Sequence, residues 1–360
     1  MNMKILLNEK GFTKQNKVFT LILAALFTLL INHTELKAQS SKNVFIAFYN
    51  QENLFDTIDT EKKIDEEYLP NAKIAWNTQK YQNKLKNMSK VILAMNEGNG
   101  PDFLGMCEVE SEIALVDLCK ELNKSGKNYK YVFYEGPDER GIDNAFIYKA
   151  ELAKSVKGHA FMISPEFIGG DKTRNILMAD VKLNNGSRIV FLVNHFPSRR
   201  EGQSESEYKR IAAAGRLKAI TDSLVLKDKK VNTVLLGDFN DHPNDKSMAE
   251  VLEGKSSMSE VSDERQFYNT MWLFHQQGLG SHKYKGEWGV LDQILLNKNL
   301  LDGKGKLKYK KGSAGIFKEE FMLETEEKYK GNPKRTFAGN KYLNGFSDHL
   351  PVYIQLEILK

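Results

Sequence analysis

The sequence has few cysteines, no internal repeat and no low-complexity tract. Its 360 residues include only Cys107 and Cys119, too few for a disulfide framework or for paired Cys/His zinc spacing. Both lie in apolar or helical stretches and are predicted to be buried thiols. The lack of a fixed-period repeat excludes solenoid architectures. With 41% hydrophobic residues, the chain can bury a large core in one large domain or two ordinary ones.

The apolar run near the N-terminus is too short for a typical membrane span. It covers residues 18–31, whereas a spanning helix needs roughly 20 residues. Lysines precede it, and a polar stretch with a small residue, Ala38, follows it. This order favours a secretory signal peptide over residues 1–38 rather than an anchor helix or a core helix. We therefore predict export to the periplasm or the extracellular space, with no membrane span after cleavage.

The chain also lacks a strong excess of charge of one sign. Without residues 1–38 it has 47 basic and 45 acidic residues, a net charge of about +2. Most of the apparent basicity therefore belongs to the predicted signal peptide. Net charge gives no argument for nucleic-acid binding, and any basic surface would have to be local.

Eight segments of the mature sequence have the β-branched and aromatic content of strands, with turn residues between them. They span residues 43–50, 102–110, 144–149, 176–183, 188–196, 232–240, 290–297 and 350–358. Helices are predicted from about 81 to 95, 111 to 122 and 205 to 226. Because helices join some strands and short turns join others, the order predicts an α/β sandwich with mixed sheets rather than a doubly wound parallel sheet.

Polar side chains gather at the ends of these predicted strands. Any one of them has an ordinary explanation as a turn residue or a satisfied hydrogen-bonding group. The set comprises Asn50, Glu108, His195, Asp238, Asn240, Asp292, Asp348 and His349.

The combination of these residue types indicates a particular chemistry. Carboxylates and amides are hard oxygen donors that suit Mg²⁺, and imidazoles can move protons near neutral pH. No serine or cysteine accompanies the set as an obvious nucleophile, and no glycine-rich phosphate loop is present. The set therefore predicts metal-assisted attack of water on a phosphate ester.

Six sequence blocks occur in the order found in one known superfamily. They read "FYNQENLF", "FLGMCEVE", "VNHFPS", "LLGDFNDHP", "VLDQILLN" and "FSDHLPV", and in this order they resemble the endonuclease/exonuclease/phosphatase superfamily from about residue 43 to 358. The resemblance implies a single catalytic domain over residues 39–360. It also implies a four-layer α/β sandwich, in which two mixed, mainly antiparallel sheets pack face to face with helices outside.

The resemblance also implies a metal site. Glu108 matches the principal metal-ligating glutamate of the family, and Asn50 matches the asparagine beside it. Asp348, beside His349, would lie near the metal or help to position that site. The expected ion is Mg²⁺, with Mn²⁺ or Ca²⁺ as alternatives.

Five further residues match catalytic positions of the family. Asp238 matches the aspartate that orients or deprotonates the attacking water, and Asn240 the amide that holds a phosphate oxygen. His349 matches the histidine that activates this water or contacts the scissile phosphate, and Asp292 its supporting aspartate. His195 matches a histidine suited to protonating the leaving oxygen. The resemblance leaves the base open between His349 and Asp238.

The stretch around Asp238 and Asn240 has a local explanation as well. Gly237 would let the chain pass close to the site. Period-two alternation predicts that Asp238 and Asn240 share one face, while Phe239 points into the core.

The most direct interpretation is a secreted endonuclease-like phosphodiesterase that acts as a monomer on nucleic acid or another phosphodiester. A sphingomyelinase-like or inositol-phosphate phosphatase-like activity could use the same site. The inositol-phosphatase branch carries a cysteine where this chain has Leu291, and this difference counts against that branch. A non-catalytic binding protein of the same fold is disfavoured, because none of the eight site positions is replaced.

Two other groups of residues have both a functional and a structural interpretation. Arg140 could contact phosphate or pair with Asp143, and the Arg199–Arg200 pair could bind a phosphodiester backbone or lie on a solvated surface. The segment from about 255 to 287 interleaves aromatic and basic residues and could contact substrate. A loop packed onto the sheets is favoured for this segment, because large aromatic side chains usually bury.

Overall fold

The sequence of strand β1 (Asn43–Leu54) explains why two sheets can stack with helices outside. Successive side chains of a strand point to opposite faces. Phe45 and Tyr49 pack into one buried cluster with the helices, while Ile46 and Phe48 pack into a second cluster between the sheets. Both faces of β1 are therefore apolar and covered. The computed structural model describes residues 43–359, so the predicted signal peptide, residues 1–38, lies outside the described residues.

Strand β1 belongs to the first of two large sheets. Its strand order is β14 (Leu307–Tyr309), β18 (Val352–Ile358), β1, β2 (Phe103–Val109), β4 (Asp143–Lys149) and β3 (Tyr129–Phe133), with β15 (Gly315–Ile316) also pairing with β18. β1 and β2 are parallel, and the other pairs are antiparallel.

The second large sheet has a similar plan. Its order is β5 (Ala153–Phe161), β6 (Ile176–Leu183), β7 (Arg188–His195), β8 (Asn232–Asp238), β13 (Asp292–Asn297), β10 (Phe267–Asn269) and β9 (Gly254–Lys255). β7 and β8 are parallel, as are β9 and β10, and the rest are antiparallel. Each sheet therefore has a parallel pair at its centre.

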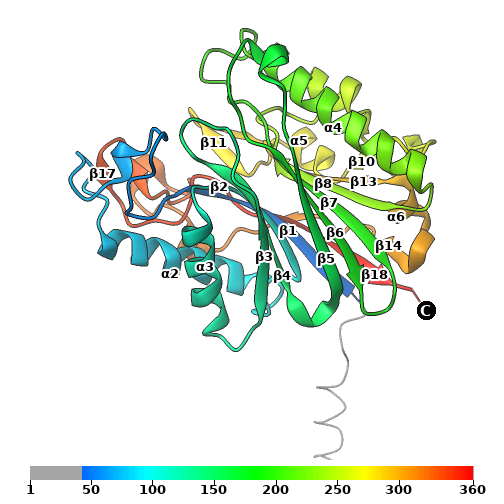
Figure 1. Cartoon of the computed structure of the whole chain (residues 1–360), viewed down its shortest axis with the longest axis horizontal. Coiled ribbons are helices and arrows are strands. Elements are labelled where there is room, and N and C mark those ends of the chain that lie inside the picture. Colours follow the sequence, from blue (N-terminus) through cyan, green and yellow to red (C-terminus); the bar gives the residue numbers. More distant parts are fainter. Residues whose placement is uncertain (1–42, 360) are drawn as a thin grey trace, which may run out of the picture. The chain divides into compact units, whose positions relative to one another are not determined.

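The long helices cross between these parallel strands and cover the outer faces. α2 (Thr78–Ala94) joins β1 to β2, and α4 (Glu207–Lys227) joins β7 to β8. α3 (Glu112–Asn123) begins where the Ser111 side chain accepts a hydrogen bond from the backbone N–H of Ala114, a typical N-cap. α2 and α3 lie outside the first sheet and α4 outside the second (Figure 1). The predicted four-layer α/β sandwich is confirmed.

Shorter elements complete the chain between the large strands. They are α5 (Trp272–Gln276), α6 (Lys298–Asp302), the hairpin of β11 (His282–Tyr284) and β12 (Glu287–Gly289), and the hairpin of β16 (Phe337–Ala338) and β17 (Lys341–Tyr342). No helix within residues 43–359 is long and apolar enough to cross a membrane.

Most predicted elements match the structure, and the differences lie at sheet edges. β3 and β5 were not among the predicted strands, and the segment 255–287, predicted as irregular, contains short pieces of strand and helix. β5 is an edge strand with polar and exposed residues, which weakens the hydrophobic pattern of a strand. Cys107 and Cys119 are buried free thiols, as predicted.

Three phenylalanines connect the two sheets across their interface. Phe103 and Phe146 come from the first sheet and Phe191 from the second. The ring centroid of Phe191 lies 5.1 Å from that of Phe103 and 4.9 Å from that of Phe146. All three side chains are fully buried. The cluster therefore fixes how the sheets stack.

Phe191→Ala is expected to lower the free energy of unfolding by about 3–5 kcal/mol, because it opens a cavity between the sheets. Urea denaturation followed by circular dichroism measures this change. Phe167→Ala is the matched control, because Phe167 is 64% exposed. Equal stability of the two variants would contradict the assigned interface.

A buried carboxyl group lies at the start of β4. One oxygen of Asp143 accepts a hydrogen bond of 2.8 Å from the backbone N–H of Gly136, and the other has no partner among the described residues. Burial raises the pKa of Asp143 to about 7. The native protein therefore holds a proton that the unfolded chain releases near pH 4, so this group lowers stability as the pH rises from about 4 to 7.

Asp143→Asn is expected to remove this loss of stability, because an amide does not ionise. Relative to the parent, the variant should gain roughly 1.4 kcal/mol per pH unit across that window. Chemical denaturation at pH 4.5, 6 and 8 measures the difference, with Asp59→Asn as the control at an exposed aspartate. A difference that does not change with pH would refute the interpretation.

Candidate active site

The topology brings the predicted site residues to one edge of the sandwich. Strands β1 and β2 are parallel, as are β7 and β8, so their carboxyl ends meet at a common edge. β13 and β18 run antiparallel to their neighbours, which places their starts at this edge (Figure 1). Asp292 at the start of β13 is the direct register partner of Asp238 at the end of β8, and Asp238 is also the partner of His195.

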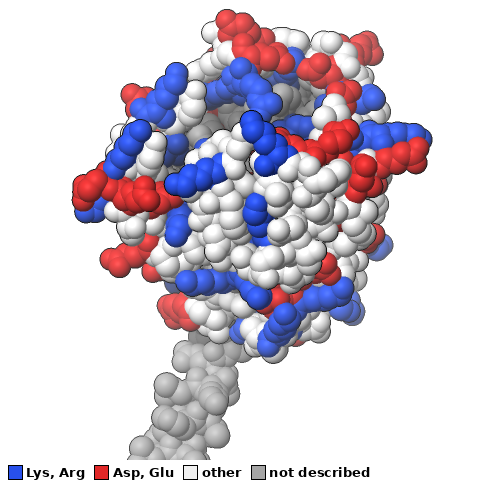
Figure 2. Space-filling model, turned by 90° about the vertical axis from the view of Figure 1, so that its left-hand side faces the viewer, with Lys and Arg blue, Asp and Glu red and all other residues white. Residues whose placement is uncertain are grey.

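The side chains at this edge line a cavity of about 850 Å³. Of the eight predicted residues, Glu108, His195, Asp238, Asn240, Asp348 and His349 line it directly. Asn50 and Asp292 are almost fully buried and lie behind these side chains, to which they are hydrogen-bonded. Figure 2 shows a hollow with Lys and Arg side chains around it. The structure therefore brings the predicted set together.

Glu108 and Asp238 line the cavity, and Asn50 holds both from behind. The Asn50 amide nitrogen lies 3.4 Å from Glu108 Oε1 and 3.1 Å from Asp238 Oδ2. Its amide oxygen accepts a hydrogen bond from the backbone N–H of Glu52. In this orientation Asn50 holds the two carboxylates and does not present an oxygen to an ion, so its role as a metal ligand stays a prediction.

The close approach of β7 and β8 depends on Gly237. A Cβ atom at this position would lie 2.3 Å from the Asn194 carbonyl oxygen, closer than non-bonded atoms allow. The next residue, Asp238, is 2% exposed. Burial raises the pKa of Asp238, with His349 opposing the shift and Asp292 adding to it. Gly237 thus permits the strand spacing that places Asp238 beside His195.

Asn240 reaches the site by a different route from the predicted one. β8 ends at Asp238, and Asn240 adopts a left-handed backbone conformation with φ of 50°. Its backbone N–H donates to Asp238 Oδ1 at 2.9 Å, and its amide donates to the Phe196 carbonyl at 3.0 Å. Phe239 is fully buried against Phe196, as predicted. A turn, rather than continued strand alternation, therefore brings Asp238 and Asn240 to the same side.

His349 and Asp292 form a buried pair. Asp292 Oδ2 lies 2.7 Å from His349 Nδ1, and the Ser281 hydroxyl donates to the same carboxylate oxygen. Burial alone would lower the pKa of His349, but Asp292, Asp238 and Asp348 outweigh it and raise the pKa well above its usual value. Nδ1 is engaged with Asp292, so His349 presents Nε2, which lies 3.9 Å from Asp238 Oδ2.

His195 lies on the other side of Asp238. Its Nε2 is 3.8 Å from Asp238 Oδ2 and 4.0 Å from Glu108 Oε1. Nδ1 is buried without a hydrogen-bond partner within residues 43–359. Burial lowers the pKa of His195 well below its usual value, and the nearby cations Arg174 and Arg140 add to this shift. The pKa values of His195 and His349 are therefore shifted in opposite directions.

Asp348 belongs to a second group of charges at the cavity wall. Its carboxylate pairs with Arg335 at 3.0 Å, and Arg335 also binds Glu52 at 3.1 Å. Burial raises the pKa of Glu52, and Asp348 adds to this shift. The ammonium of Lys84, buried in α2, donates to the Phe346 carbonyl at 2.6 Å. Asp348 therefore lies in a network with Arg335, and its role near a metal stays a prediction.

The sequence did not single out Glu52, Arg335 and Lys84. Glu52 follows Asn50 by two residues within the block "FYNQENLF", so its place in that block was the available signal. Arg335 comes from the long connection between β15 and β18, which carries no recognisable pattern. Its contact with the site depends entirely on tertiary structure.

The four arginine and aspartate candidates near the site differ in their roles. Arg140 donates to Asn53 at 2.7 Å and lines the cavity, while Asp143 binds Gly136 instead of Arg140. Arg199 holds the turn after β8 through the Asn240 carbonyl and two aspartates. Arg200 is exposed at the cavity, and among the described residues it has no ion-pair partner.

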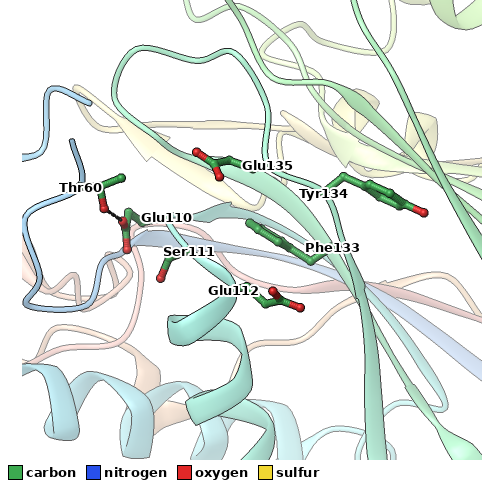
Figure 3. Close-up of a pocket in the computed structure, with 7 residues that line it drawn as sticks. All are labelled: Thr60, Glu110, Ser111, Glu112, Phe133, Tyr134 and Glu135. Atoms are coloured by element: carbon green, nitrogen blue, oxygen red, sulfur yellow. Dashed lines mark hydrogen bonds between the residues drawn. The ribbon is translucent and has the colours of Figure 1, made fainter. Parts of the chain in front are cut away.

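A second cavity of about 310 Å³ lies away from these residues. It is lined by Thr60, Glu110, Ser111, Glu112, Phe133, Tyr134 and Glu135 (Figure 3). The Thr60 hydroxyl donates to Glu110 at 3.0 Å. The lining contains carboxylates but no histidine, arginine or lysine, so it offers no cationic side chain that could bind phosphate.

The donors of the first cavity fit a hard divalent cation. The carboxylate of Glu108 is 17% exposed and faces the cavity next to buried Asp238. One ligand atom each from Asp238, Asp292 and His349 lies within 4.8 Å of the others. One or two carboxylates with several waters are the usual ligands of Mg²⁺ in proteins. The role of Glu108 as the principal ligand of such an ion stays a prediction.

Known structures share this fold at low sequence identity. An endonuclease/exonuclease/phosphatase family protein from Bacteroides thetaiotaomicron is similar at a TM-score of 0.52 and 14% identity, with 88% of this chain and 98% of that chain covered. A mannosyl-6-phosphatase from the same organism is similar at a TM-score of 0.51 and 14% identity (87% and 99% covered). D. rerio TDP2 complexed with a single-stranded DNA product is similar at a TM-score of 0.50 and 15% identity (87% and 98%). At these identities the likeness shows the fold alone.

Sequence comparison is more specific. No curated protein sequence matches the chain. The model of the endonuclease/exonuclease/phosphatase family matches residues 45–358, which include all eight predicted site residues and both large sheets. The chain therefore belongs to the endonuclease/exonuclease/phosphatase family.

Proposed function

We propose that this chain is a divalent-metal-dependent phosphodiesterase that cleaves nucleic acids by in-line attack of water. Members of its family are phosphoesterases that depend on divalent metals. The observation that carries the proposal is the single cavity in which Glu108, Asp238 and His195 face His349, itself held by Asp292. Both imidazoles and the carboxylates needed for hydrolysis converge there.

The arginine side chains around the cavity support a substrate that carries phosphate. The lining includes five arginines, which are Arg140, Arg174, Arg199, Arg200 and Arg335. Arginine is well suited to binding phosphate, because its guanidinium group can donate two parallel hydrogen bonds. The same lining carries five carboxyl groups, those of Glu52, Glu108, Asp238, Glu287 and Asp348, so the support comes from the guanidinium donors and not from an excess of positive charge.

Each proposed role follows from a contact at the site. An ion held by Glu108 would stabilise the negative charge that develops on the phosphate. Asp238, fixed by Asn50 and by the backbone N–H of Asn240, would orient the attacking water and accept its proton. His349 would donate from Nε2 to a phosphate oxygen, since Asp292 holds Nδ1.

His195 and Asn240 would complete the reaction. His195 faces Asp238 and Glu108 from the β7 side, where it can donate to the leaving oxygen. A bound phosphate brings negative charge to the ring and raises its pKa towards the range needed for donation. The amide of Asn240 would hold a phosphate oxygen. Asp348 would act from the cavity wall through its pair with Arg335.

A phosphomonoesterase is the second candidate. The observation that favours it is the likeness to the mannosyl-6-phosphatase, which equals the likeness to TDP2 in coverage and nearly in TM-score. A sugar phosphate would place the same phosphate group among the same residues. The two candidates differ in their substrates: a phosphodiesterase acts on a phosphate with two ester bonds, and a phosphomonoesterase acts on a phosphate with one.

A substrate panel decides between these candidates. It offers single- and double-stranded DNA, RNA, sphingomyelin, inositol phosphates, mannose 6-phosphate and bis-p-nitrophenyl phosphate, each with Mg²⁺, Mn²⁺ or Ca²⁺. We expect the highest kcat/KM on a nucleic acid. A higher value on a phosphomonoester would replace the proposal with the second candidate, and failure on every substrate would indicate a binding protein.

Glu108→Gln is expected to lower kcat/KM about 10²- to 10³-fold, because the neutral amide binds a divalent ion poorly and stabilises less transition-state charge. The loss should be partly reversed by a higher metal concentration. Glu112→Gln is the matched control, since Glu112 lies four residues away on α3 and lines the other cavity. Full activity of the parent chain in EDTA would refute the metal-dependent mechanism.

We also propose that residues 1–38 direct export and are removed, leaving residues 39–360 as one catalytic domain. The support is the order of basic, apolar and small residues in the sequence. Mass spectrometry of the full chain expressed in a Gram-negative host should find, in the periplasm or medium, a product beginning near residue 39. A cell-retained product that still begins at Met1 would contradict this expectation.

A further inference from the structure

A short hairpin projects beside the catalytic cavity. Residues 281–289, named here the arm, contain β11 and β12 and form a separate two-stranded sheet. Its two turn residues, Lys285 and Gly286, both have positive φ angles of 49° and 93°. Such a turn matches the twist of a two-stranded hairpin and holds its shape. The arm is therefore a defined structure and not a loose loop.

The base of the arm is attached to the catalytic pair. The Ser281 hydroxyl donates to Asp292, and the backbone N–H of Leu350 donates to the Ser281 carbonyl at 2.7 Å. The ring of His282 lies against the ring of His349, with the centroids 4.6 Å apart. Burial lowers the pKa of His282 to about 4, so the ring packs there as a neutral group. The arm thus has a fixed position relative to His349.

The next residue on the same face of the arm is Tyr284. Residues two apart on a strand share a face and are separated by about 7 Å. Tyr284 therefore extends the row of rings from His349 and His282 along the cavity. It lines the cavity and yet is 66% exposed. An exposed aromatic side chain on a rigid support provides a surface for a flat ligand.

Both signs of charge accompany these rings, because Glu287 is the register partner of Tyr284, while lysines lie against the aromatic rings of the arm. Trp288 also lines the cavity, and the ammonium groups of Lys283 and Lys318 lie 5.4 and 4.8 Å from its ring centroid. Lys285 lies 5.3 Å from the ring of Tyr284. Aromatic rings interleaved with cations are the usual components of a surface that binds single-stranded nucleic acid. The packed loop favoured from the sequence for this segment does not account for the exposure of Tyr284.

We propose that the arm binds a nucleobase of a single-stranded nucleic acid by stacking it on Tyr284, next to the phosphate under attack. This inference rests on the proposed phosphodiesterase function and specifies its substrate. In a duplex the base faces are stacked on one another, so an unpaired base is the form that can reach the ring. The substrate class is therefore a strand with accessible bases next to the scissile bond.

The test compares two oligonucleotides that have the same phosphodiester backbone and differ in whether they carry bases. The first is a single-stranded thymidine oligonucleotide, and the second has the same length with tetrahydrofuran abasic residues in place of nucleosides. Kinetics are measured for the parent chain, Tyr284→Ala and Tyr284→Phe. The matched control is Tyr329→Ala, because Tyr329 is 48% exposed and is not among the residues that line the cavity.

We expect Tyr284→Ala to lower kcat/KM on the thymidine strand at least about fivefold, mainly through KM, since one base–aromatic stack has an energy of about 1–3 kcal/mol. The same variant should act like the parent on the abasic strand. Tyr284→Phe should keep most of the activity, because it keeps the ring. Equal losses on both strands, or no loss on the thymidine strand, would overturn the inference.

The outcome separates this inference from the proposed function. If the parent cleaves both strands and Glu108→Gln does not, the phosphodiesterase function stands whatever Tyr284→Ala does. If the parent cleaves neither strand but cleaves double-stranded DNA, this inference alone is overturned, and if it cleaves no nucleic acid, the proposed function fails as well. If Tyr284→Ala loses activity on mannose 6-phosphate instead, the ring serves a sugar, and the nucleobase inference is overturned.

Discussion

The two sheets must pack in a single relative position, because the residues of the candidate site come from both of them. Asn50 and Glu108 belong to strands of the first sheet, and His195, Asp238 and Asp292 to strands of the second. The hydrogen bond from His349, which precedes β18, to Asp292 crosses from one sheet to the other. The phenylalanine cluster around Phe191 holds the same interface from within the core.

Negative charge is the second constraint on the site. Three carboxyl groups, those of Asp238, Asp292 and Asp348, lie close to His349, and Glu52 lies close to Asp348. Glu52, Asp238 and Asp292 are almost fully buried. Burying carboxylates without partners is unfavourable. Arg335, Lys84 and His349 supply part of the compensating charge. A divalent cation held by Glu108, as proposed, would supply further positive charge.

The sequence predicted the parts of the structure that repeat a local pattern. Strands with two apolar faces, such as β1 and β8, were recognisable as runs of β-branched and aromatic residues, and helix α2 by apolar residues at helical spacing. The site residues were recognisable because strands end at a common edge. The family resemblance then supplied their roles.

Other parts depend on contacts that no local pattern encodes. The polar edge strand β5 lacks an apolar face. Arg335 reaches Glu52 across 283 residues of sequence, and the amide orientation of Asn50 is set by Glu52 and Asp238 together. The left-handed conformation of Asn240 replaced an expected strand alternation. The arm was predicted as irregular, since its three-residue strands are too short for a periodic signal.

The division of the site between two sheets has a consequence for its motion. His349 Nε2 and Asp238 Oδ2 are 3.9 Å apart, yet they are carried by different layers of the molecule. Any sliding of one layer over the other changes this separation directly, whereas vibration within a layer does not. Dense packing between the layers keeps such sliding small. Phe103, Phe146 and Phe191 lie in the core and away from the cavity. By holding the layers together, they limit how far the distance between His349 and Asp238 fluctuates.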